Sequence, residues 1–270
     1  MNSKLFPDKG FTHGGIFHAD DVFTTALLKI LNPDFRWERG FVVPEDFDGI
    51  VYDIGCGEFD HHQADARVRE NGVPFASFGL VWEKYGGYVL DEKEAEAFDK
   101  DFVQMLDLTD NTGSRNPLSS LIHDMNPEWN EEVSSDEAFD KAVEFAIFTL
   151  ETQFKHIQSR KEADSIIQEK LSEAVGQTLY IGEYVPWGTA LKDTDIQYVI
   201  YKSERGGYNI QIVPHKDEDE TTKSFPVEWR GKTRDELEKI TGIKGLTFCH
   251  NAGFLCATET LEAAWAVTMK

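Results

Sequence analysis

Residues 10–31 have the sequence GFTHGGIFHADDVFTTALLKIL. The short apolar start predicts a β-strand, the glycine pair predicts a turn, and the apolar positions after Asp21 recur with the spacing of an α-helix. Acidic residues in the first helical turn suit the positive end of the helix dipole, and Asn32-Pro33 ends the helix. This stretch therefore predicts a strand, a loop and a helix in succession.

The same alternation continues toward the middle of the chain. Residues 49–55, GIVYDIG, are typical of a buried parallel strand that carries an acid, Asp53, at its carboxyl end. Residues 77–86 and 92–110 have helical patterns. Strands that alternate with helices indicate an α/β domain with a mostly parallel sheet and helices on both faces, which we place at residues 1–133.

A long helical stretch follows this domain. Residues 134–137, SSDE, form a capping box, and the helical pattern runs to about residue 175. We expect one or two breaks in it, because residues 154–156 interrupt the apolar period. Residues 134–176 are therefore predicted to be a helical connector between two domains.

The remaining chain changes character. Four segments have strand patterns, namely 197–202, 208–213, 246–250 and 253–257. The first two flank a glycine-containing turn and predict a β-hairpin, and a helix closes the chain. We therefore predict a smaller α+β domain at residues 177–270. Within it, the polar segment 215–225 predicts a surface loop.

The composition limits the classes of function. The chain has 270 residues, enough for two domains, and a net charge of −22. So acidic a surface argues against a long footprint on duplex DNA, although bound metal ions could still hold phosphate locally. No apolar run approaches the roughly 18 residues of a membrane helix. Residues 1–8 lack an apolar signal core, so we expect a cytoplasmic protein.

Histidines and acids gather at three places in the first domain. They are His13, His18, Asp20 and Asp21 around the glycine turn, Asp53 at the second strand, and Asp60, His61 and His62 in the next loop. The carboxyl ends of parallel strands meet at one edge of a sheet, where open α/β folds place their sites. Mixed imidazole and carboxylate ligands at that edge could surround the two divalent ions of a metal-dependent hydrolase. We expect Mn²⁺. Mg²⁺, Co²⁺, Fe²⁺ and Zn²⁺ are alternatives, because the ligand types alone do not select among these ions.

Each of these groups also has a purely structural explanation. A His-His pair in a loop is usually a solvated surface feature, Asp20 and Asp21 could cap a helix, and Asp53 could be a turn residue. His13 could be a core histidine whose hydrogen bonds are satisfied within the protein. The joint occurrence of these residues at successive strand ends is what favours a metal site.

These residues resemble the motifs of the DHH phosphoesterase superfamily. That superfamily carries His and Asp on a glycine-bearing loop, an Asp after the second strand and an Asp-His-His triplet. The matching segments here are His13–Asp20, Asp53 and Asp60–His62, except that His18 stands where an Asp is usual. Thr12–Asp21 is instead similar to the Thr-His-x-Gly-x-Phe-His-x-Asp-Asp/Glu motif of the Myg-type exonuclease family, named after the melanocyte-proliferating-gene product.

The resemblance extends over most of the chain. Further segments similar to motifs of that family are 107–111, 126–130, 185–187, 198–201, 228–231 and 248–254. Several of them contain tryptophan, which makes the match specific. The resemblance implies a DHH-type metal-binding domain, a substrate-binding C-terminal domain, and a metal-dependent 3′-to-5′ exonuclease that acts on RNA or on short oligonucleotides.

The resemblance also implies roles for individual residues. One ion would be held by His13, His18 and Asp53. The other would be held by Asp20, Asp53, His61 and either Asp107 or Asp110, with Asp53 bridging. Asp107 and Asp110 are about one helical turn apart, so the sequence does not choose between them. Asp60 would orient a ligand histidine, and His62 would contact the scissile phosphate.

Substrate binding is implied for a second set of residues. The candidates are His250, Asn251, Gly253, Arg115, Arg230 and Lys232. For the first three the alternative is an ordinary turn between strands, and for the basic residues it is a solvated surface. Trp187 and Trp229 could stack on a base or pack in the core.

Two other functions are compatible with the sequence. One is a phosphohydrolase for a small molecule, such as a cyclic dinucleotide, a nano-RNA or pyrophosphate, because an acidic surface favours short substrates. The other is a metal-binding protein without turnover. The expected partner is single-stranded RNA or a short oligonucleotide, with no membrane, and the oligomeric state is left open, a dimer included.

Overall fold

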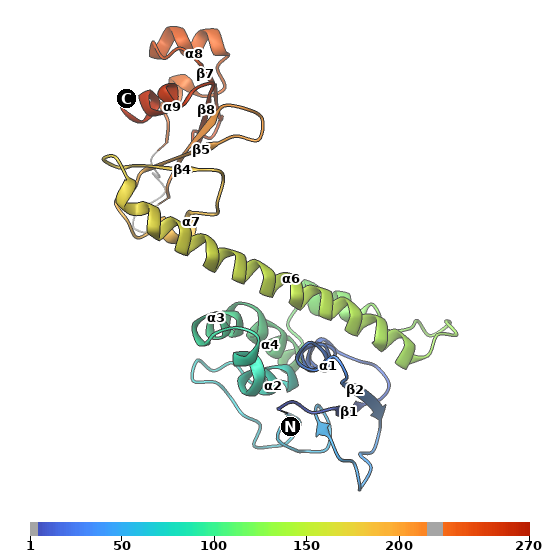
Figure 1. Cartoon of the computed structure of the whole chain (residues 1–270). Coiled ribbons are helices and arrows are strands. Elements are labelled where there is room, and N and C mark those ends of the chain that lie inside the picture. Colours follow the sequence, from blue (N-terminus) through green and yellow to red (C-terminus); the bar gives the residue numbers. More distant parts are fainter. Residues whose placement is uncertain (1–4, 215–223) are drawn as a thin grey trace. The chain divides into compact units, whose positions relative to one another are not determined.

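The computed structural model describes residues 5–214 and 224–270 and is shown in Figure 1. Most of the predicted polar loop at 215–225 lies outside the described residues. The chain forms two compact units, Met1–Ile157 and Gln158–Lys270, and the boundary falls inside helix α6. Among the described helices, none is both long and apolar enough to cross a membrane.

A parallel three-stranded sheet organises the first unit. Its strands β1 (Lys9–His13), β2 (Arg36–Gly40) and β3 (Ile50–Val51) lie in the order β2-β1-β3. Strands β1 and β3 confirm the two predicted strands and their parallel arrangement. Strand β2 was not predicted, because its sequence RWERG lacks the apolar run of a buried strand. It lies at an edge of the sheet, where Arg36 and Glu38 are exposed to solvent.

Helices flank this sheet. They are α1 (Ala19–Leu31), α2 (Ser77–Tyr85), α3 (Glu92–Phe98), α4 (Gln104–Thr112) and α5 (Pro117–His123), with a 3-10 turn at Gly86–Tyr88. The segment predicted as one helix over 92–110 contains a π-helical turn, Asp99–Val103, between α3 and α4. The sequence did not predict α5, which begins where the Asn116 side chain accepts hydrogen bonds from two backbone N–H groups.

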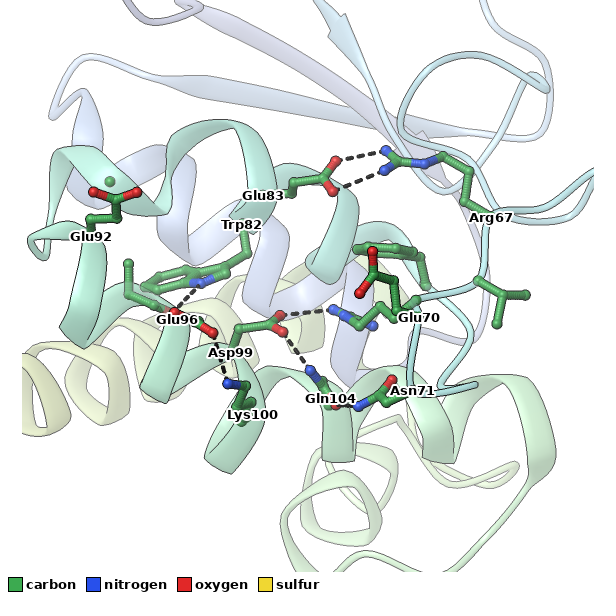
Figure 2. Close-up of a pocket in the computed structure, with 15 residues that line it drawn as sticks. Arg67, Glu70, Asn71, Trp82, Glu83, Glu92, Glu96, Asp99, Lys100 and Gln104 are labelled. Atoms are coloured by element: carbon green, nitrogen blue, oxygen red, sulfur yellow. Dashed lines mark hydrogen bonds and ion pairs between the residues drawn. The ribbon is translucent and has the colours of Figure 1, made fainter.

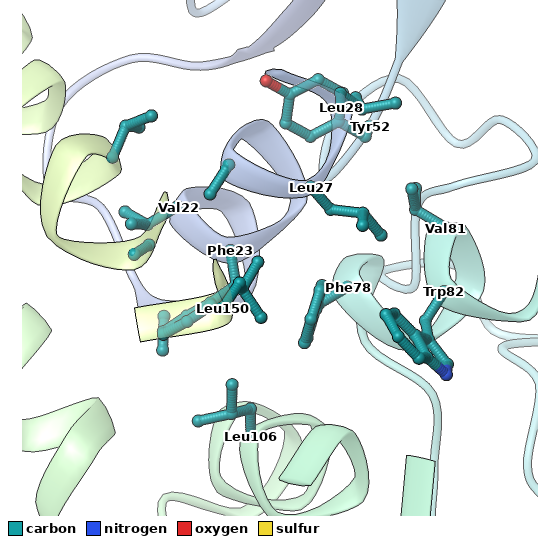
Figure 3. Packing of buried hydrophobic residues seen from close by; sticks show 14 of the residues in the cluster. Val22, Phe23, Leu27, Leu28, Tyr52, Phe78, Val81, Trp82, Leu106 and Leu150 are labelled. Carbon is teal, nitrogen blue, oxygen red and sulfur yellow. The ribbon is translucent and has the colours of Figure 1, made fainter. Parts of the chain in front are cut away.

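Helix α1 lies inside the hydrophobic core of the first unit. Its residues 19–28 are all buried, and Figure 3 shows Val22, Phe23, Leu27 and Leu28 among side chains from other elements. The ring centroids of Phe23 and Phe78 are 5.6 Å apart. Because the helix is enclosed by packed side chains, the polar residues of its first turn are held in fixed positions beside the sheet.

Helix α6 (Ser135–Lys170) is a single helix of 36 residues, so the expectation of a break near residues 154–156 is wrong. The segment interrupts the apolar period but contains neither glycine nor proline, and polar residues such as Lys and Gln are good helix formers. Phe154 is also anchored, since its ring lies 5.9 Å from that of Trp82 and 5.4 Å from that of Phe98.

The second unit contains a mixed five-stranded sheet. Its strands are β4 (Thr178–Gly182), β5 (Tyr198–Lys202), β6 (Tyr208–Ile212), β7 (Leu246–Cys249) and β8 (Leu255–Thr258), in the order β4-β5-β6-β8-β7. Only the β4–β5 pair is parallel. The predicted hairpin is confirmed as β5 and β6, and β7 and β8 confirm the two later strands. Strand β4 was not predicted.

Short helices complete this unit. They are the 3-10 turns Leu171–Glu173 and Val227–Trp229 and the helices α7 (Gly188–Leu191), α8 (Arg234–Thr241) and α9 (Leu261–Thr268). Thr233 and Glu236 form a reciprocal capping box at the start of α8. Trp187 and Trp229 are each 5% exposed and belong to the hydrophobic clusters of this unit, which favours core packing for both rings over base stacking.

Candidate metal centre

The parallel strands bring His13 and Asp53 together. His13 is the last residue of β1, Asp53 follows β3, and the two side chains meet at 3.1 Å between His13 Nε2 and Asp53 Oδ2. Asp53 has a φ of +57°, in the left-handed region that non-glycine residues rarely occupy. Such strain persists only where the surroundings enforce it, and it is common at functional sites.

The first turn of α1 adds two buried carboxylates, Asp20 and Asp21. Asp21 Oδ1 accepts a hydrogen bond from the backbone N–H of His18, while its Oδ2 lies 3.2 Å from His13 Nε2. Asp20 Oδ2 accepts a hydrogen bond of 3.0 Å from the Ser77 hydroxyl. One helix terminus therefore presents two carboxylates to the sheet edge, and the positive end of the helix dipole favours their negative charge.

His61 joins this group from the loop after β3. Its Nε2 lies 3.1 Å from Asp53 Oδ1, 3.2 Å from Asp110 Oδ2 and 3.7 Å from Asp20 Oδ2. Its Nδ1 is 3.3 Å from the side-chain oxygen of Asn111. The Asn111 amide group donates to two backbone carbonyls, so its oxygen is the acceptor and His61 Nδ1 is the donor.

The tautomers of both histidines therefore follow from their neighbours. His13 Nδ1 lies 3.1 Å from the carbonyl oxygen of Gly14, as His61 Nδ1 lies beside Asn111. An Nδ1–H that donates to such a partner leaves Nε2 as the nitrogen with a free lone pair once the ring is neutral. Nε2 of each ring faces the carboxylates, which is the orientation that a metal ligand requires.

Asp60 contacts His62. Asp60 Oδ1 lies 2.7 Å from His62 Nδ1, and its Oδ2 accepts a hydrogen bond of 2.6 Å from the backbone N–H of Cys56. Burial would raise the pKa of Asp60, but the hydrogen bonds from His62 and from the Cys56 and His62 backbone outweigh it and hold the pKa below its usual value. The ionised Asp60 thus orients a histidine whose side chain is 59% exposed.

The structure places Asp107 and Asp110 in different surroundings. Asp107 is buried against Arg69, whose Nη2 is 2.7 Å from its Oδ2, and it accepts a hydrogen bond of 3.0 Å from the backbone N–H of Gly79. Asp110 points to the histidines, with Oδ2 3.2 Å from His61 and Oδ1 3.9 Å from Nδ1 of His18. Of the two, only Asp110 lies in the cluster.

Three sets of side chains are each close enough to share a metal ion, and two of the sets share Asp53. They are His13, Asp21 and Asp53; Asp53, His61 and His62; and His18, Asp20 and Asp110. The grouping differs from the expected one, because Asp21 stands beside His13 and Asp53 where His18 was expected. In addition, His62 groups with Asp53 and His61, while Asp20 and Asp110 group with His18. His18 lies near Asp110, and its ring centroid is 5.9 Å from that of His13.

Burial and the neighbouring charged groups shift the pKa values of the residues in this cluster. Burial, followed by the charges of Asp53, Asp110 and Asp21, raises the pKa of Asp20 well above its usual value. Burial also raises the pKa of Asp21 to about 7, although the charge of His13 opposes this. Burial would lower the pKa of His13, but the hydrogen bond to Asp53 and the charges of Asp21 and Asp53 outweigh it and raise the pKa to about 9.

These shifts mean that the cluster retains protons to offset its own negative charge. Asp53 is the exception, because hydrogen bonds from His13 and His61 hold its pKa below the usual value despite burial. Asp20 Oδ1 is also buried without a hydrogen-bond partner among the described residues, and Asp21 Oδ2 makes no hydrogen bond there, although it lies 3.2 Å from His13 Nε2. Unsatisfied buried oxygens and retained protons both fit a site for divalent cations, which would take the place of the protons.

A cavity of about 600 Å³ opens beside this cluster in the first unit. It is lined in part by His18, His62 and Asp110, and the predicted substrate residue Arg115 lies on its wall. Figure 2 shows a larger cavity of about 910 Å³, in which Arg67 pairs with Glu83 and other lining residues pair with one another. None of the predicted site residues lines that larger cavity, so its size alone does not mark it as the site.

The other candidate substrate residues lie in the second unit. His250, Asn251 and Gly253 form the turn between β7 and β8, and the Arg230 guanidinium packs directly against Gly253. Arg230 Nε donates a hydrogen bond of 3.0 Å to the carbonyl of Phe225. Lys232 Nζ stands 3.8 Å from Glu236 instead. The structure therefore brings His250, Asn251, Gly253 and Arg230 together, whereas Lys232 is paired with a surface acid.

Sequence reasoning gave no site role to three residues around the cluster. Asp21 was counted among the clustered acids but was assigned no metal, and in the structure one of its oxygens caps α1 while the other faces His13. Asn111 follows Asp110 directly, but its contact with His61 depends on how α4 packs against the loop after β3. His123 lines the smaller cavity and belongs to α5, which the sequence pattern did not reveal.

Comparisons with known proteins identify the family of the chain. The sequence model of the MYG1 exonuclease family, described as "Uncharacterised protein family (UPF0160)", matches residues 10–270. The MYG1 protein of Dictyostelium discoideum is 26% identical over 96% of this chain and 94% of its own length. The MYG1 exonuclease of Homo sapiens is 28% identical over 97% of this chain and 85% of its own length. No solved structure matches significantly. Since the family model covers nearly the whole sequence, the chain belongs to the MYG1 exonuclease family.

Proposed function

We propose that this chain is a metal-dependent phosphodiesterase, a 3′-to-5′ exonuclease that acts on RNA or on short oligonucleotides. The observation that carries the proposal is the position of Asp53, whose two oxygens face different histidines at 3.1 Å each. A carboxylate placed in this way suits a bridge between two cations. The relatives of Homo sapiens and Rattus norvegicus that bear the name MYG1 exonuclease support the reaction class.

The distances support two groups of ligands. One ion would be held by His13, Asp21 and Asp53, and the other by Asp20, Asp53, His61 and Asp110. When bound, such ions lower the pKa of a water and stabilise negative charge on a phosphoryl oxygen. Nitrogen and carboxylate ligands without thiolates suit Mn²⁺, with Mg²⁺, Co²⁺, Fe²⁺ and Zn²⁺ as alternatives.

Two exposed histidines remain for the substrate. The side chains of His18 and His62 are 51% and 59% exposed, and both line the 600 Å³ cavity. Asp60 holds His62 through Nδ1, which leaves its Nε2 available to contact the scissile phosphate or to protonate the leaving oxygen. Asp60 therefore acts in this proposal as the positioning residue for His62.

Hydrolysis of labelled oligoribonucleotides tests the proposal. The purified protein, loaded in turn with each of the five metals, should shorten a labelled oligoribonucleotide from its 3′ end, one nucleotide at a time. Asp53→Asn should abolish cleavage and lower metal content, whereas Asp46→Asn, the same change at an exposed position, should do neither. If the wild type binds metal but hydrolyses no phosphodiester with any of these ions, the protein is a metal-binding protein without turnover.

A small-molecule phosphohydrolase is the second candidate. The cavity beside the cluster has a volume of about 600 Å³, and the chain carries a net charge of −22. Both features favour short substrates, because a long polyanion would be repelled beyond the site. A length series from dinucleotides to 20-mers, together with a cyclic dinucleotide and pyrophosphate, separates the candidates, since cleavage confined to the shortest members would favour this second function.

A further inference from the structure

The cavity beside the metal centre is lined in part by residues that have no role in the proposed hydrolysis. One side consists of Leu106, Thr109 and Asp110, which share a face of α4 because they are three or four residues apart. Another part of the lining comes from α5 and from the loop before it. A volume of about 600 Å³ lies in the range of small-ligand sites and suits one or two nucleotides.

The wall on the α5 side carries two cationic or proton-donating groups without partners. Arg115 lies in the loop and His123 is the last residue of α5, and neither side chain makes a hydrogen bond or an ion pair with any residue that the structure describes. The chain has 49 acidic and 27 basic residues, so carboxylates for such pairing are abundant. A guanidinium that is left unpaired beside an acidic cluster is available for a bidentate contact with phosphate.

A third polar group points to a ligand at the same wall. The hydroxyl oxygen of Ser119 is buried and has no hydrogen-bond partner among the described residues. Ser119 and His123 are four residues apart on α5, so they lie on the same side of that helix. Arg115 and His123 thus offer hydrogen bonds to the cavity that the described residues do not satisfy, and the Ser119 hydroxyl is a further unsatisfied group at the lining.

We propose that this wall binds the terminal phosphate of a short oligonucleotide, with Arg115 and His123 contacting that phosphate while His62 faces the next phosphodiester. The inference rests on the proposed function and deepens it by naming the chemical group that is recognised, a phosphate at the chain end. Arg115 was expected to bind substrate on the sequence pattern alone, and the cavity adds the position, the partner residue His123 and the length of substrate that fits.

Dinucleotides that differ in a terminal phosphate provide the test. Turnover of ApA, pApA and ApAp by the Mn²⁺-loaded protein gives the gain in kcat/KM from a phosphate at either end. The wild type should prefer one phosphorylated form by about tenfold or more, the scale of a charge-assisted hydrogen bond. In Arg115→Gln and His123→Gln this preference should fall toward one, so the loss of kcat/KM on the preferred dinucleotide should exceed the loss on ApA and on bis(p-nitrophenyl) phosphate, which lack a terminal phosphate.

Arg36→Gln is the matched control. Arg36 is exposed at the start of β2, whereas Gly40, the residue that pairs with His13, is at the other end of that strand. Substitution of Arg36 by glutamine removes the same charge as Arg115→Gln. The Arg36→Gln variant should keep the preference of the wild type. Equal losses on all substrates in Arg115→Gln would overturn the proposal, because they would indicate a role in folding or in metal binding. A wild type indifferent to terminal phosphates would also overturn it.

Failure of the proposed function would look different. If the wild type hydrolyses none of these substrates, calorimetric binding of ApA, pApA and ApAp to the metal-loaded protein replaces turnover. Tighter binding of one phosphorylated dinucleotide, lost in Arg115→Gln and kept in Arg36→Gln, would support the phosphate site without exonuclease activity. Equal binding of all three dinucleotides would refute it.

Discussion

Replacement of Asn111 by alanine tests how the metal centre is oriented. Asn111 holds His61 through a contact of 3.3 Å and is itself fixed by hydrogen bonds of 3.1 and 2.9 Å to the carbonyls of Phe75 and Asp107. Without it, the His61 ring loses the acceptor that keeps the proton on Nδ1 and turns Nε2 toward Asp53. Loss of such an orienting partner typically weakens metal binding by about 10–100-fold, which is about 1.4–2.7 kcal/mol.

The effect on folding should be smaller than the effect on metal binding. Three hydrogen bonds at about 1 kcal/mol each set an upper bound, but the Asn111 side chain is exposed, so water replaces much of what is lost. We expect the free energy of unfolding of the metal-free protein to fall by about 1 kcal/mol. Calorimetric titration of the metal-free protein with Mn²⁺ and chemical denaturation measure the two effects separately.

Two further variants make this test specific. Asn111→Asp keeps an acceptor for His61 Nδ1 and should recover most of the lost Mn²⁺ affinity. Asn71→Ala removes the same amide from the larger cavity, where Asn71 bonds to Gln104 at 2.8 Å, and should leave Mn²⁺ affinity unchanged. Wild-type affinity in Asn111→Ala would refute the argument that this residue sets the tautomer of His61.

Three other outcomes follow from the same contacts. Gly79→Ala should lower the free energy of unfolding by about 1–3 kcal/mol, because its Cβ would overlap a buried carboxylate, whereas Gly87→Ala, whose Cβ meets nothing within 4 Å, should not. Asp60→Asn should reduce kcat by about 10–100-fold with metal content intact, since Asp60 acts by holding His62. A loss of bound metal as large as the loss of kcat would contradict this role. In metal-free protein the pKa of His13 is raised from 6.5 to about 9, so its stabilising contribution is complete below pH 6.5 and is lost as the pH rises through 9. Thermal unfolding in a chelator should show this decline, and His13→Gln should flatten it.

The parts of the site that sequence reasoning located are those that local patterns determine. Asp53 ends a short apolar run, and His13 ends another, so the parallel pairing of β1 with β3 was enough to bring them together. The Asp60–His62 triplet follows in the next loop. These positions depend on strand order and strand ends, both of which leave a signal in hydrophobic periodicity.

The parts that it missed depend on contacts between distant segments. Asp107 and Asp110 look equivalent on α4, but Asp107 is bound by Arg69, from the segment before α2, and by the backbone N–H of Gly79, whereas Asp110 faces His61. The π-helical turn before α4 is likewise invisible to a 3.6-residue period. Helix α6 persists through residues 154–156 because aromatic packing holds Phe154.

Crystallographic location of Mn²⁺ by anomalous diffraction tests the central claim most directly. Crystals of the full chain grown with Mn²⁺ should give two anomalous peaks flanking Asp53, about 3.5–4 Å apart, as in two-metal sites. His13 and Asp21 should contact one ion, and His61 and Asp110 the other. A single peak, or peaks that Asp53 does not contact, would contradict the account.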